Sequence, residues 1–336
     1  MYTDEDLDSA IKSGIFTEEA IAKFRQQITS SKNTLLVDEE NFRLLSGFND
    51  IFVVIACVLL LSSVLVIFSP ENKNAGVAIF TLLSWGLAEF FVRYRKMALP
   101  AIVLLLAFVG GSFYFILGLF VTPTETSYIS ATAISAIAAF LHWQRFRVPI
   151  TVAAGTAAIA GFVVASTLSI IPNYKEWVLV PLFICGVASF IFAMYWDTSD
   201  RSRVTRKSDV AFWLHLLAAP LIIHPVFSAL GILEGNVKLE SILLVICLYF
   251  LMTFISIIID RRALMVSSLI YVLYAISKLF EVYGSIAHSF AITGIVIGSA
   301  LLFLSAFWHS ARAKILLILP QRIQERVPVN KLRPTN

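Results

Sequence analysis

Two histidines and two prolines stand close together in HLLAAPLIIHP, within one long apolar run. His215 and His224 carry imidazoles, which bind protons or metal ions near neutral pH. They lie nine residues apart, and at about 100° per residue this spacing puts them on opposite sides of a helix. A shared metal site prefers histidines four residues apart. We therefore expect His215 and His224 to have separate roles.

The prolines of the same segment remove backbone hydrogen-bond donors. Pro220 and Pro225 leave the carbonyls of Leu216 and Leu221 without their usual helical partners. In an apolar environment such carbonyls need donors from neighbouring helices, side chains or water. Two interpretations stay open: a functional break in a helix, or a kink that the helix tolerates.

Lys278 and Glu281 form a second group of ionisable residues in an apolar run, and His288 follows them. Ionisable groups inside a membrane are costly and often mark transport pathways or proton relays. Alternatively, Lys278 pairs with Glu281 along the helix or extends to the headgroups. The candidate pathway or ligand-binding residues are His224, Lys278, Glu281, His215 and His288.

Other polar residues are expected to have structural roles. Glu89 lies four residues before Arg93, the spacing of a helical ion pair. Asp260 stands beside two arginines and is expected in a solvated turn. The three cysteines, in separate apolar runs without a CxxC spacing, are expected to pack as small apolar residues.

The chain lacks the common motifs of catalysis and nucleotide binding. It contains no Walker loop, GxGxxG, HExxH or GxSxG motif. We therefore expect no catalytic residue, no cofactor and no metal site. The basic loops hold no aromatic-rich surface, so we expect no nucleic-acid partner.

Composition explains why the candidate residues lie in apolar runs. Apolar residues make up 58% of the 336 residues and charged residues only 14%, against about half and a quarter in soluble domains. Several runs reach the 18 or more residues that cross a bilayer as a helix. The sequence predicts an all-α, polytopic membrane helix bundle with the lipid bilayer as its main partner.

We predict about ten transmembrane helices. Their expected limits are 50–68, 75–92, 99–121, 127–143, 148–171, 177–196, 210–232, 240–259, 264–282 and 287–307.

The distribution of basic residues supports this count. All Lys and Arg residues except Lys73, Lys175, Lys238 and Lys278 fall on one side of the predicted membrane. Cytoplasmic loops carry such an excess of positive charge, so both termini are expected in the cytoplasm. Tryptophans near the span ends, among them Trp308, are expected at the lipid interface.

The two ends of the chain differ from the membrane domain, predicted over 48–308. Residues 1–47 read as a small cytosolic helical hairpin and linker, with a stop at Gly14 and a second helix starting at Thr17. So small a hairpin needs a surface to pack on: the membrane domain, a second copy or a protein partner. Residues 309–336 are predicted to form a basic amphipathic tail. The tail begins with a short interfacial helix, which ends at Pro320.

The basic turns recur along the chain. They begin at Arg93, Arg145, Arg201, Arg261 and Arg312, one helical hairpin apart each time. Gene duplication explains this period, and so does any bundle with short loops.

Two segments, SGIFTEEAIAKFRQQI (13–28) and DRRALMVSSLIYVLYAI (260–276), show a resemblance. The chain resembles bacterial predicted multi-pass membrane proteins of unknown function with a short N-terminal helical segment. This resemblance implies a bacterial cytoplasmic (inner) membrane protein and carries no known site residues.

We consider three classes of function for this sequence. The first is a non-enzymatic transporter of a small solute, ion or lipid. The second is a membrane scaffold or sensor that binds a partner through its N-terminal hairpin. The third, an intramembrane enzyme acting on lipid, would need an acid or nucleophile grouping that the sequence does not show.

Overall fold

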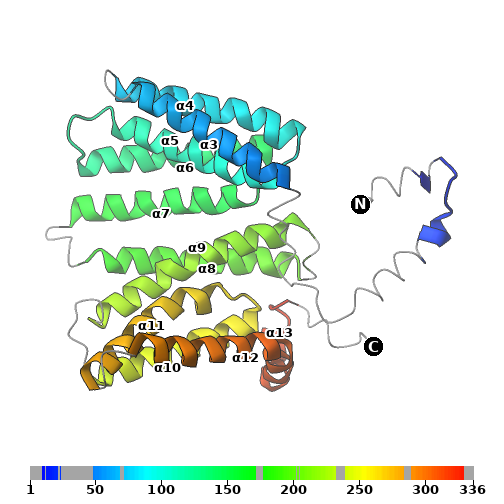
Figure 1. The fold of residues 1–336 in the computed structure, drawn as a ribbon, viewed down its shortest axis with the longest axis vertical. Coiled ribbons are helices and arrows are strands. Elements are labelled where there is room, and N and C mark those ends of the chain that lie inside the picture. The colour runs from blue at the N-terminus through cyan, green and yellow to red at the C-terminus, as the bar shows by residue number, and fades with distance from the viewer. Residues whose placement is uncertain are drawn as a thin grey trace. The chain divides into compact units, whose positions relative to one another are not determined.

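A computed structural model describes most of the chain in detail (Figure 1). The described residues are 10–11, 13–21, 23, 48–68, 72–171, 177–201, 203, 205–231, 239–283 and 289–328. The chain divides into two compact units, Met1–Arg43 and Leu44–Asn336.

The first unit contains the expected helix start. The Thr17 hydroxyl accepts a hydrogen bond from the Ala20 amide at 3.2 Å, and the Thr17 carbonyl accepts one from the Ile21 amide at 3.1 Å. Gly14 has a φ of 70°, a left-handed conformation that favours glycine. Much of the unit lies outside the described residues, so the hairpin as a whole stays a prediction.

The second unit is built from helices, and its described residues contain no strand. The helices are α3 Phe48–Phe68, α4 Lys73–Ala88, η1 Glu89–Tyr94, α5 Ala98–Leu117, α6 Glu125–Phe146, α7 Ile150–Ile170, α8 Leu179–Ser199, α9 Arg206–Ala229, α10 Leu239–Ile259, α11 Ala263–Tyr283, α12 Ser289–Ile318 and α13 Gln321–Gln324.

Each predicted span coincides with one helix from α3 to α12, with η1 extending α4. Among the described residues, seven helices are long and apolar enough to cross a membrane: α3, α4 with η1, α5, α7, α8, α9 and part of α12. The length and composition of these helices are compatible with a multi-pass membrane protein. That α6, α10 and α11 also cross, giving about ten spans, stays a prediction.

The helices pack largely in chain order, as Figure 1 shows from α3 and α4 to α10–α12. Helices α3 to α7 form one group, in which each helix packs on others one or two places away in the chain, and α10, α11 and α12 form a second group. Helix α9 joins the two groups, because it packs on α7, α8 and α11. A movement of α9 therefore changes its contacts with both groups at once.

Basic turns at one end of the unit share a backbone conformation. Four non-glycine residues have a positive φ in the described chain: Lys96 (53°), Arg147 (54°), Arg203 (55°) and Asp260 (57°). Each lies in a turn that joins two successive helices, and we call this end of the unit the basic end. The predicted repeat of basic turns thus extends to local geometry.

Helix α9 is continuous through both of its prolines. The interpretation of the HLLAAPLIIHP segment as a helix break is therefore wrong. Helix α8 approaches this segment closely at Gly186, where a Cβ atom would lie 2.7 Å from the carbonyl carbon of Leu221. Only glycine leaves room for that backbone.

Helix α12 departs from the sequence prediction at the C-terminal end. It runs without interruption to Ile318, so residues 309–318 are its last turns and do not form a separate interfacial helix. Arg312 is buried in this region, because its guanidinium faces protein groups described below. Pro320 does follow the helix end, as expected.

Candidate functional site

The most deeply buried charges of the described chain meet around Asp197, in the last turn of α8. The Nε2 atom of His215 lies 2.9 Å from one Asp197 oxygen, and Arg261 Nη2 donates to the other at 2.7 Å. All three side chains are at most 1% exposed. We call these residues, with Ser208, the Asp197 cluster.

Arg261 ties three elements together in this cluster. Besides Asp197 on α8, its Nη2 donates to the backbone carbonyl of Ser208 at 3.1 Å and to the Ser208 hydroxyl at 3.2 Å, both in the first turn of α9. Arg261 itself lies in the turn between α10 and α11. The cluster therefore couples the positions of α8, α9 and the α10–α11 turn.

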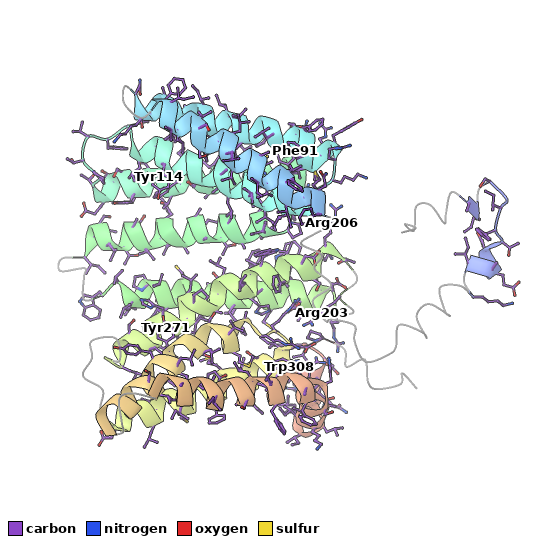
Figure 2. All side chains as sticks on the ribbon, in the orientation of Figure 1. Phe91, Tyr114, Arg203, Arg206, Tyr271 and Trp308 are labelled. Carbon is purple, nitrogen blue, oxygen red and sulfur yellow. The ribbon has the colours of Figure 1, made fainter. Side chains whose placement is uncertain are left out.

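A second cluster, the Asp260 cluster, lies at the same end. Arg203 Nη1 donates to Asp260 Oδ2 at 3.0 Å, and the indole nitrogen of Trp308 donates to Asp260 Oδ1 at 2.8 Å. Arg312 Nε stands 3.7 Å from the same oxygen, and its Nη2 donates to the Pro328 carbonyl at 2.7 Å. Figure 2 labels Arg203 and Trp308, both at the basic end.

The Asp260 cluster rests on an unusual backbone. Arg203 and Asp260, the two partners of one ion pair, both have left-handed φ angles, which cost side-chain-bearing residues free energy. Arg203 compensates in part, because its Nη2 also donates to the carbonyls of Ile259 and Asp260 at 3.2 and 2.9 Å. Burial lowers the pKa of its guanidinium, which still stays charged near neutral pH.

Formal charges balance across this region when His215 is neutral. Three carboxylates and three guanidiniums are each less than 10% exposed: Asp197, Asp200, Asp260, Arg203, Arg261 and Arg312. His215 Nδ1 is buried without a hydrogen-bond partner among the described residues. A proton taken up there would add a positive charge with no matching carboxylate. Protonation of this imidazole would therefore give these buried groups a net positive charge.

The predicted candidate residues are only partly brought together. His215 and His224 have different partners, as expected: His215 pairs with Asp197, whereas His224 Nδ1 lies 2.7 Å from the Tyr271 hydroxyl on α11. Lys278 and Glu281 belong to α11, but their side chains lie outside the described residues, and so does His288. That Lys278, Glu281 and His288 belong to a pathway or ligand-binding site therefore stays a prediction.

The burial of the residues in these two clusters was not expected from the sequence. Asp260 was predicted in a solvated turn, yet it is 6% exposed, because Arg203 and Trp308 cover it. Trp308 was predicted at the lipid interface and is 1% exposed instead. Asp197 directly follows the predicted span 177–196, a position where a charged residue is normally solvated, so its burial has no signal in the sequence.

A separate ion pair connects η1 and α6 near the basic end. Glu89 lies 3.4 Å from Arg93, which confirms the predicted helical pair. A shorter contact was not predicted: Arg145 donates to both Glu89 oxygens at 2.6 and 3.0 Å. These side chains are 31% and 41% exposed, so solvent weakens this pair relative to the Asp197 cluster.

Comparisons with protein-family models, with curated proteins and with solved structures find no match to this chain. The arrangement of its own residues must therefore carry any functional argument.

Proposed function

We propose that this chain is a membrane transporter that couples the movement of a small solute or ion to protons. Asp197 and His215 are the residues that carry the proton. The observation that supports the proposal most is the fully buried contact between them, 2.9 Å long, inside helices of membrane-spanning length. Ionisable groups at such positions are costly, and chains of Asp, Glu and His act as proton relays in pumps and transporters.

The position of α9 supports a link between protonation and movement. His215 faces Asp197 on α8, while His224, farther along α9, contacts Tyr271 on α11. A charge gained at His215 weakens the balance that holds Arg261 on α8 and α9. Displacing α9 then also alters the contact between His224 and Tyr271, toward the opposite end of the bundle.

The setting of the transporter follows from the sequence. The excess of Lys and Arg at the basic end supports an orientation with this end and both termini in the cytoplasm. The resemblance noted above supports a bacterial inner membrane.

One observation favours the scaffold or sensor function as a second candidate. Ile15 and Phe16, beside the described helix start in the first unit, are 70% and 51% exposed. Exposed apolar side chains of this size suit a protein partner or a second copy. This function requires residues 1–43 and does not require His215 to bind protons.

The proton movement of purified protein in liposomes separates the two functions. Proteoliposomes that contain a pH-sensitive dye would be exposed in turn to amino acids, sugars, organic acids and monovalent cations. We expect at least one solute to move protons faster than in protein-free liposomes. The His215→Asn variant, which keeps a donor toward Asp197 but cannot carry a proton, should lower this rate at least tenfold.

Glu89→Gln serves as the matched control, because it neutralises a carboxylate of a more exposed ion pair. It should retain the wild-type rate. If wild type and His215→Asn move protons at the same rate with every active solute, Asp197 and His215 are not the proton carriers. If no solute moves protons and deletion of 1–43 abolishes a cellular phenotype, the scaffold function is favoured.

A further inference from the structure

A pocket of about 610 Å³ lies among α3, α4 and α5, away from the buried charges. Its walls are apolar over most of their length, with Leu65, Val77, Phe80, Leu106 and Leu117 among the lining residues. Tyr114, which also lines it, is labelled in Figure 2 at the end opposite Arg203. Volume and lining suit an apolar ligand or part of one.

The polar groups of this pocket gather at one end. Lys73 and Asn74 begin α4, and Gly118 follows the last residue of α5. The Asn74 side-chain amide donates to the Gly118 carbonyl. A Cβ atom at position 118 would collide with Asn74, so glycine is required for this contact. Lys73 is exposed beside it and supplies a positive charge.

The apolar part extends from this polar end along α5. Leu106 and Gly118 both line the pocket, and their separation of twelve positions corresponds to about 18 Å along a helix. A ligand that fits has an anionic group at one end and a long apolar chain. In a membrane protein, the molecule with this chemistry that is always present is a phospholipid of the bilayer.

We propose that this pocket holds an acyl chain of an anionic phospholipid, with the phosphate-bearing headgroup beside Lys73. The pairing of a cation at the polar end with an apolar wall carries the proposal, because the positive charge of Lys73 attracts a negatively charged phosphate at short range. It does not depend on the proposed transport function.

Gly110 offers a direct way to block the pocket. It lines the pocket, and a Cβ atom added there would meet nothing within 4 Å. The Cβ atom of a leucine at this position would therefore lie in open space, and the rest of its side chain would occupy part of the pocket. Gly86 on α4 has the same free surroundings but does not line the pocket, so Gly86→Leu is the matched control.

Native mass spectrometry of the detergent-purified protein tests this site. The protein would be titrated with phosphatidylglycerol or phosphatidylcholine, and bound lipid counted. We expect wild type and Gly86→Leu to retain phosphatidylglycerol preferentially. Gly110→Leu should weaken that binding at least tenfold, and Lys73→Gln should bind the two lipids equally.

Thermal unfolding of each variant verifies that it folds as wild type does. Undiminished phosphatidylglycerol binding by a folded Gly110→Leu protein would overturn the site. Equal weakening by Gly110→Leu and Gly86→Leu would also overturn it, since the pocket would then have no special part. Displacement of phosphatidylglycerol by an equal concentration of oleate would show a fatty-acid site instead of a phospholipid site.

Discussion

At the scale of single residues, the chain holds two kinds of ion pair. Asp197 and Arg261 are at most 1% exposed. Removing either one would leave the charge of the other buried without its partner, which costs free energy. Glu89 and Arg145 are partly exposed, and water can replace either partner. The two pairs should therefore respond very differently when one arginine is removed.

Arg261→Met leaves the Asp197 carboxylate buried without its guanidinium. The loss of one partner from a buried pair costs about 3–5 kcal/mol, which we expect as a reduced free energy of unfolding in detergent. Arg145→Met, the matched control, should cost clearly less. Equal losses in the two variants would mean that the Asp197 cluster is more hydrated than its burial indicates.

The sequence predicts part of this site. His215 stands out because a histidine within an apolar run is unusual, and the separate roles of the two histidines follow from helical spacing. Asp197, Asp260 and Arg261 lie near predicted span ends, where charged residues are normally solvated. Their burial depends on contacts between residues that are 48 to 64 positions apart in the chain, and no local pattern reveals such contacts.

At the scale of the elements, close packing of α8 on α9 fixes Asp197 opposite His215. Gly186 makes this approach possible, because Leu221 and Ile222 backbone atoms lie where its Cβ would be. The approach occurs beside the proline-containing part of α9, where the helix is least able to adjust through its own hydrogen bonds.

Gly186→Ala should therefore destabilise the protein, because backbone atoms 2.7 and 2.9 Å from the new Cβ cannot rotate away. Overpacking of this kind costs about 1–3 kcal/mol, measurable as a lower unfolding temperature. Gly86→Ala, in open surroundings, should leave stability unchanged or raise it. A Gly186→Ala protein as stable as wild type would show that α8 and α9 separate readily.

Helix positions are the best-predicted feature, since long apolar runs and short polar turns mark them directly. The extension of α12 to Ile318 was missed. Arg312 and Lys314 were predicted in a short interfacial helix near the headgroups, but Arg312 is buried against Asp260 and the Pro328 carbonyl. The positive charge of Arg312 suggested that the membrane domain ends before it, but this residue forms a tertiary contact with Asp260.

At the scale of the whole molecule, the number of crossings decides which ends share a compartment. Eight helices, α5 to α12, separate Lys96 from Arg322. If all of them cross, these two exposed residues lie on the same side, and Thr122 lies on the other.

Single cysteines at 96, 122 and 322, in a background without the three native cysteines, test this topology. In intact cells, a membrane-impermeant thiol reagent should label only the cysteine at 122. Permeabilised cells provide the control that all three are reactive. Labelling at 322 but not at 96 would show that an odd number of helices crosses between them.

We propose that the Asp197 cluster has a function beyond holding α8, α9 and the α10–α11 turn together. Replacing a whole buried ion pair by apolar residues is often neutral or stabilising, so stability and function can be separated. The decisive measurement is proton movement in proteoliposomes of the triple variant Asp197→Leu, His215→Leu, Arg261→Met, alongside its unfolding temperature. We predict a protein as stable as wild type that has lost solute-linked proton movement. A stable triple variant that moves protons as wild type does would contradict the claim.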